Sequence, residues 1–152
     1  MASLVQRLRE QVFGRVSGSN FTTTNNTATT VTGLTFNIGA NEEWVIDVAL
    51  TTQCSSTGGV KYAISVPATA SVEGWIQTST SALTTLSFQR FTSTGLTSTA
   101  AHTVATTPGP DVMRVWVKST GGGTVAIQVA SGTSGQTTTV FIGSFMKAQR
   151  VA

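Results

Sequence analysis

From residue 31 onward, apolar and polar residues alternate along many stretches of the chain, and this alternation constrains the fold more than any other feature. Neighbouring side chains of a β-strand point to opposite faces, so a period of two predicts strands with one buried face. The stretches that show it clearly are 34–38, 44–51, 60–66, 112–118 and 124–130. Those that show it weakly are 72–77, 83–91, 100–105, 137–142 and 145–149. Clusters of glycine, proline and asparagine predict turns between them, among others at 39–41, 108–111 and 121–123.

Short strands at spacings of roughly 12 residues, with no helical pattern between them, are typical of antiparallel sandwiches and barrels. We therefore expect an all-β, antiparallel, jelly-roll-like sandwich of eight or nine strands over residues 31–152. Only 10% of the residues are charged, while 39% are hydrophobic, which is not the composition of a disordered chain. The frequent threonines suit the pleated surface of a sheet.

The first 30 residues follow a different pattern. Within residues 3–13, the apolar side chains fall at helical spacing, namely Leu4, Val5, Leu8 and Val12. We expect an amphipathic helix within residues 1–16, ending near Gly14, and a polar linker arm over residues 17–30. A helix of about eleven residues is marginal in isolation, so its apolar stripe needs either the chain's own sandwich or another subunit.

The formal net charge of +3 belongs to the two ends of the chain. The residues before position 17 include three arginines and one glutamate, and Lys147 and Arg150 lie near the C-terminal end. These basic residues are too few and too dispersed for nucleic-acid binding, which needs clustered basic residues. No stretch approaches the ~20 apolar residues of a membrane span, and no apolar run suggests a signal peptide. We expect neither a nucleic-acid nor a membrane partner.

The chemistry-bearing residues are few and scattered. One histidine, His102, and one cysteine, Cys54, are too few for a typical structural zinc site, and no Gly-x-Ser-x-Gly elbow or P-loop is present. Glu42 and Glu43 are neighbours, so on a strand they point to opposite faces. Glu73 and Asp111 are far apart in sequence. We therefore predict no catalytic site, no metal and no cofactor.

The position of each tryptophan in the alternation indicates which face of its strand it occupies. Trp44 shares parity with apolar neighbours on its strand, which predicts a core position. Trp116 shares parity with Arg114 and Lys118, so we predict that it lies on the exposed face and is a possible interface residue. The alternation around Trp75 does not indicate whether it lies in the core or on the exposed face.

Three segments resemble known hairpins. Residues 33–48 (GLTFNIGANEEWVIDV), 122–131 (GGTVAIQVAS) and 139–148 (TVFIGSFMKA) are similar to strands of small β-sandwich structural modules of tailed bacteriophages. Such modules occur as capsid decoration proteins, often trimers, and as tips of tail fibres and spikes. The resemblance covers about residues 31–150 and consists of strand and turn patterns, not of a catalytic signature.

The resemblance implies a non-enzymatic virion protein. Because the module stands nearly alone behind a short arm, we expect a head decoration protein on the capsid surface, bound to the major capsid protein and to itself as a homotrimer. The arm residues expected to contact a partner are Leu4, Val5, Arg7, Leu8, Arg9, Val12 and Phe13.

Two alternatives stay open. One is a fibre or spike tip that binds a host receptor glycan, which would use exposed aromatic residues such as Trp116. The other is a small coat protein that builds a shell itself, with its basic arm turned inward to nucleic acid.

Overall fold

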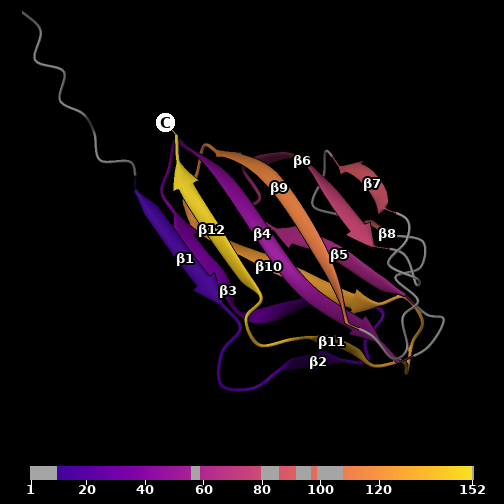
Figure 1. Cartoon of the computed structure of the whole chain (residues 1–152). Helices are drawn as coiled ribbons and strands as arrows, with labels where there is room; N and C mark the ends of the chain where they lie inside the picture. The colour runs from indigo at the N-terminus through magenta and orange to yellow at the C-terminus, as the bar shows by residue number, and fades with distance from the viewer. Residues whose placement is uncertain (1–9, 56–58, 80–85, 92–96, 99–107, 152) are drawn as a thin grey trace, which may run out of the picture.

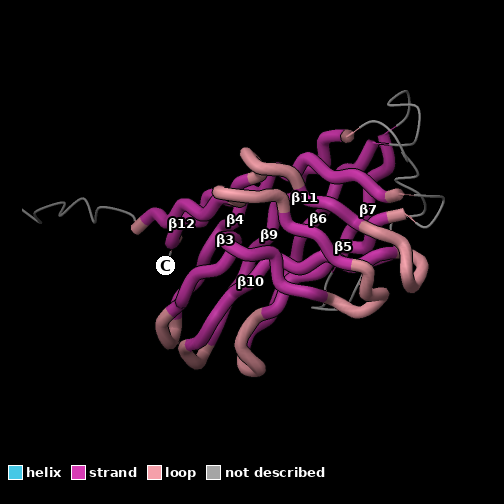
Figure 2. Tube along the Cα trace, turned by 90° about the horizontal axis from the view of Figure 1, so that it is seen from below, coloured by secondary structure: helices cyan, strands magenta, loops and turns pink. Residues whose placement is uncertain are grey.

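The computed structural model describes residues 10–55, 59–79, 86–91, 97–98 and 108–151. These residues form twelve β-strands in two antiparallel sheets (Figures 1 and 2). The eight strands of the large sheet are β1 (Gln11–Arg15), β2 (Phe21–Thr23), β4 (Glu42–Cys54), β6 (Ala70–Ser79), β7 (Leu86–Phe91), β9 (Gly109–Ser119), β11 (Thr138–Val140) and β12 (Phe145–Arg150). The four strands of the small sheet are β3 (Thr29–Ile38), β5 (Val60–Ser65), β8 (Thr97–Ser98) and β10 (Gly123–Ser131).

The order of the strands joins segments that are distant in sequence. The large sheet runs β1-β12-β4-β9-β6-β7, with β11 beside β4 and β2 beside β11. The small sheet runs β3-β10-β5-β8, and in Figure 1 its strands lie behind those of the large sheet. The all-β, antiparallel prediction is confirmed for the described residues. Their strand count exceeds the predicted eight or nine because β1, β2 and β8 are short and carry no alternation of their own.

One hydrophobic core lies between the sheets, built from the apolar side of each alternating strand. On β4 the side chains of Trp44, Ile46, Val48 and Leu50 are buried, as their parity predicts. The rings of Phe36 on β3 and Trp44 lie 5.1 Å apart, which joins the small sheet to the large one. Close packing of such side chains is the main source of the fold's stability.

A polar cluster also lies in the core. The hydroxyls of Tyr62 and Thr52 each donate to Oδ2 of Asp111 at 2.5 Å, and they lie 2.9 Å from each other. Burial raises the pKa of Tyr62 well above its usual range, and the neighbouring Asp111 adds to the effect.

The sequence prediction of a turn at residues 108–111 is wrong, because Gly109, Pro110 and Asp111 begin β9. A proline fits there, close to the first residue of a strand.

The N-terminal helix prediction is wrong for residues 11–13. Gln11–Arg15 form strand β1, which pairs with β12 from Gln11 opposite Gln149 to Arg15 opposite Phe145. The pairing partner lies more than a hundred residues away, so it leaves no local signal in the sequence. The remainder of the predicted helix, residues 1–9, lies outside the described residues.

The segment predicted as a polar linker contributes strands as well. β2 pairs with β11, and β3 begins at Thr29, so residues 17–30 lie along the domain. Val16 is buried, and its amide donates to the carbonyl of Ser144 at 2.8 Å. The predicted strand at 100–105 lies outside the described residues.

Glu42 anchors the start of β4 through its carboxylate. Oε2 accepts from the amide of Gly39 at 2.7 Å and from Nε1 of Trp44 at 2.9 Å, while Oε1 lies 2.8 Å from Nη1 of Arg150. The hydrogen bond from Gly39 lowers the pKa of Glu42 most, followed by that from Trp44, and Arg150 adds its charge. The carboxylate thus ties a turn, the core and the last strand together.

We expect Glu42→Gln to lower the free energy of unfolding near neutral pH by about 1–2 kcal/mol, because charge-assisted hydrogen bonds are lost. The folded pKa is below the unfolded one, so the stabilisation is present above the unfolded pKa and is lost as pH falls through the folded pKa. Urea unfolding of both proteins at about pH 7 and about pH 2.5 measures this. Glu10→Gln is the control, since Glu10 is exposed and 4.0 Å from Arg150. An undiminished difference at low pH would contradict the role of the charge.

Candidate functional site: an aromatic face on the large sheet

The outer face of the large sheet carries most of the large exposed apolar side chains of the described residues. On β9 the burial alternates, with Met113, Val115 and Val117 buried and Arg114 and Trp116 on the other face. The pairing registers place six exposed apolar side chains on this outer face, namely Phe13, Phe145, Trp116, Trp75, Phe88 and Leu86. Exposed apolar side chains gathered on one face in this way are typical of an interaction site.

A row of cross-strand neighbours crosses the middle of this face. In register order it consists of Phe13, Lys147, Asp47, Arg114, Trp75 and Arg90. Nζ of Lys147 lies 5.8 Å from the centre of the Phe13 ring, within cation–π range. Asp47 accepts two hydrogen bonds from Arg114, at 2.5 Å from Nε and 3.0 Å from Nη2, and they raise the pKa of Arg114. The bidentate pair fixes the position of the Arg114 guanidinium relative to Asp47, and the register places Arg114 opposite Trp75.

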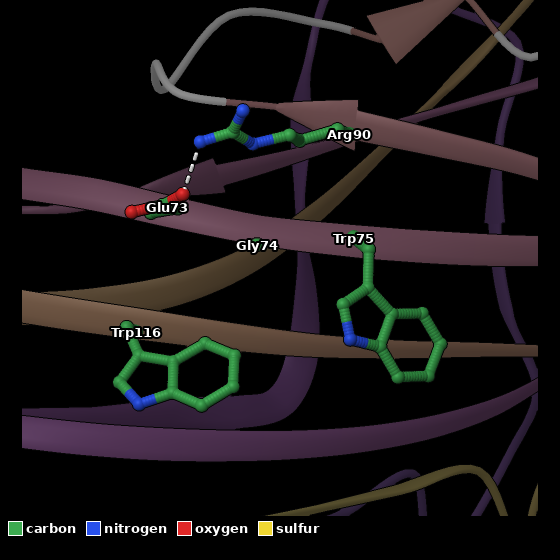
Figure 3. A pocket seen from close by; sticks show the side chains of 5 residues that line it. All are labelled: Glu73, Gly74, Trp75, Arg90 and Trp116. Atoms are coloured by element: carbon green, nitrogen blue, oxygen red, sulfur yellow. Dashed lines mark hydrogen bonds and ion pairs between the residues drawn. The ribbon is translucent and has the colours of Figure 1, made fainter.

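Two tryptophans border a shallow hollow at the β6–β9 boundary. Trp75 is 38% and Trp116 is 40% exposed, and the side chains of Glu73 and Arg90 complete the lining with Gly74. Figure 3 shows Trp75 and Trp116 set apart across the hollow, with Arg90 and Glu73 joined by an ion pair. Register places Trp116 directly opposite Glu73, which makes Trp75 its diagonal neighbour.

Two further hollows adjoin this one, and they share its tryptophans. One is lined by Trp75 together with Asp47, Arg114 and Phe145. The other is lined by Trp116 and Glu73 together with Glu43, Lys118 and Ser71. We call the three together the tryptophan trough, lined by Trp75, Trp116, Glu43, Lys118, Asp47, Arg114, Glu73 and Arg90.

The predicted contact residues fall in different places. Trp116 lies on the exposed face, as its parity predicted, and its interface role stays a prediction. Val12 packs against the core, whereas Phe13 is 69% exposed. Five of the predicted arm residues lie outside the described residues, namely Leu4, Val5, Arg7, Leu8 and Arg9.

Sequence reasoning missed Trp75 and its neighbours. On β6, Val72 and Ile76 are buried, so Trp75 takes the opposite parity together with Glu73. The alternation of Val72, Gly74 and Ile76 was the available signal, and the glycine weakened it. Arg90 reaches the site from β7, and no spacing in the sequence indicates that.

No cluster of metal-binding side chains is found within the described ranges. Among those residues, no group of three or more His, Cys, Asp and Glu side chains is placed to hold a metal ion. Glu73 is exposed on the outer face, while Asp111 is buried on the core side, so these two acids do not meet. His102 lies outside the described residues. In the part of the chain that the structure covers, no helix has the length and apolar character needed to cross a membrane.

No protein-family model and no curated protein sequence matches the chain. Among solved structures, it is similar to that of infectious bursal disease virus Gt strain, at 10% identity and a TM-score of 0.24, covering 95% of this chain and 42% of that chain. For the VP2 subviral particle of infectious bursal disease virus, the identity is 11% and the TM-score 0.23, with 96% and 38% covered. The chain therefore spans about two fifths of these longer proteins. TM-scores this low establish neither a shared fold nor a shared role.

Proposed function

We propose that this chain is a structural virion protein with a jelly-roll fold. The observation that carries the proposal is the nested pairing of eight successive strands: β3 with β10, β4 with β9, β5 with β8, and β6 with β7. A ribbon of nested antiparallel pairs folded over into two sheets is the jelly-roll arrangement, which is common in viral capsid and lectin domains. The three segments that resemble phage β-sandwich modules lie in strands of this ribbon and in β11 and β12.

Within the virion, we propose a head decoration protein that binds the major capsid protein on the capsid surface. A protein that binds only the assembled lattice stabilises it by its binding free energy, by mass action over many sites. This role needs no catalytic group. The sequence resemblance to decoration modules, which are often trimers, supports a homotrimer on the lattice.

The N-terminal segment is the proposed attachment. β1 is the end strand of its sheet path, and residues 1–9 precede it, with Leu4, Val5 and Leu8 supplying apolar contacts and Arg7 and Arg9 supplying charge. Phe13 projects from β1 on the outer face, where it is 69% exposed although Nζ of Lys147 lies 5.8 Å from its ring centre. Burying such side chains on a neighbour stabilises the contact by roughly 25 cal/mol per Å² of apolar surface.

Copy number in purified virions tests the proposal. We expect quantitative mass spectrometry to find this chain in numbers comparable to those of the major capsid protein. A few copies per particle would instead place it in the tail or fibre, and complete absence would remove it from the virion.

Phe13→Ala tests the attachment. We expect this variant to bind isolated capsids about tenfold more weakly, the effect of losing a large buried contact side chain. Phe88→Ala is the matched control, because Phe88 is also exposed on the outer face but lies on β7, away from β1. Both variants should keep the wild-type unfolding midpoint and sedimentation coefficient. Equal capsid binding by the two variants would contradict the role of β1.

A further inference from the structure

We propose that the tryptophan trough binds an extended, neutral polysaccharide chain. This binding site goes beyond the proposed structural role and rests on different residues.

The two indoles suit the flat, apolar face of a sugar ring. Trp75 and Trp116 are each about two fifths exposed and are anchored on adjacent central strands, so they offer rigid apolar surface at little entropic cost. As diagonal neighbours, their positions lie about 7–8 Å apart. That separation allows each indole to stack on a different ring of one chain, whereas a single monosaccharide would contact only one of them.

The polar groups of the trough alternate with the aromatic ones. The trough contains three pairs of an acid and a base that face each other across the β-ladders or are joined as an ion pair: Asp47 with Arg114, Glu73 with Arg90, and Glu43 with Lys118. Carboxylates accept hydrogen bonds and the basic groups donate them, so each hollow can satisfy hydroxyl groups in both directions.

The charge balance selects a neutral ligand. Three acids and three bases line the trough, so it presents no net charge that would attract an acidic polymer. A protein partner is a poorer match, because the centres of protein interfaces are depleted in charged residues, whereas the Glu73–Arg90 ion pair borders the hollow that the two tryptophans line.

The two tryptophans of the trough lie away from β1 along the sheet. β12, β4 and β9 lie between β1 and β6 in the sheet order, at about 4.8 Å per strand. Trp75 therefore lies four strand spacings from β1 on the same face of the sheet, and Trp116 lies three.

The test is affinity electrophoresis of the full chain in gels containing dextran, glucomannan, galactan or hydroxyethyl cellulose, with alginate as the acidic probe. We expect at least one neutral polysaccharide to retard the protein, and Trp75→Ala and Trp116→Ala each to weaken that binding about tenfold or more. Phe88→Ala is the control, since Phe88 is 66% exposed on the same face but does not line the trough. Fluorescence provides a second readout, because bound polysaccharide should shield Trp75 and Trp116 from acrylamide while buried Trp44 is unaffected.

Four results would overturn the proposal: no retardation by any neutral polysaccharide, retardation by alginate alone, retention equal in the tryptophan variants and Phe88→Ala, or a change of sedimentation coefficient in the tryptophan variants. The last result would assign the trough to contact between copies of the chain. None of these results bears on the virion copy number, so the proposal can fail while the structural role stands.

Discussion

Trp44→Ala is expected to lower the free energy of unfolding by about 3–5 kcal/mol, the range for removing a large aromatic side chain from a core. Trp44 is 1% exposed, contacts Phe36 across the two sheets and donates its indole N–H to Glu42. The substitution leaves a cavity between the sheets and removes one of the donors that hold the Glu42 carboxylate. Urea unfolding followed by circular dichroism gives the change in stability.

The other two tryptophans provide the matched controls. Trp75→Ala and Trp116→Ala are expected to change the free energy of unfolding by about 1 kcal/mol or less, as is usual for exposed positions. A loss as large as that of Trp44→Ala would mean that the outer face is buried in the native protein. Small effects would show that the fold does not require large aromatic side chains at these two positions. Exposed aromatic residues that do not contribute to stability are expected at a binding site.

The side of the sheet on which a residue lies was predictable where alternation is unbroken. Trp44 was correctly assigned to the core and Trp116 to the outer face, because a period of two leaves only two choices. Next to Trp75 the alternation is interrupted by Gly74, which has no side chain and therefore does not indicate which face of the strand is buried. The local sequence does not predict on which face Trp75 lies. Pairing with Arg114 on β9 determines that Trp75 faces outward.

The candidate site was much less predictable than the strands. Asp47 and Arg114 meet across β4 and β9, and Glu73 meets Arg90 across β6 and β7. These partners are set by strand order, and many orders bury the same apolar faces equally well. The same limit explains the N-terminal error: Leu4, Val5, Leu8 and Val12 fit a helical stripe, but Val12 lies in a strand because β12 offers it a partner.

Gly33→Ala is expected to destabilise the protein by about 3 kcal/mol, from positive-φ strain and backbone overlap together. Gly33 has a φ of +89°, and a Cβ there would lie 2.2 Å from the carbonyl oxygen of Arg15. The approach is mutual, since a Cβ at Gly14 would lie 2.5 Å from the Gly33 oxygen. A methyl group at either position forces β1 away from β3.

Gly18→Ala separates the two contributions. Gly18 has a similar φ of +81°, but nothing lies within 4 Å of its added Cβ, so only the backbone strain of about 1 kcal/mol is expected. Urea midpoints compare the two variants, and equal losses would mean that the contact between β1 and β3 contributes nothing. If β1 presents the N-terminal segment to the capsid, Gly33→Ala should also weaken capsid binding more than Gly18→Ala does, under conditions where both remain folded. Polysaccharide binding should be equal for the two, because the trough is built on strands that neither substitution touches.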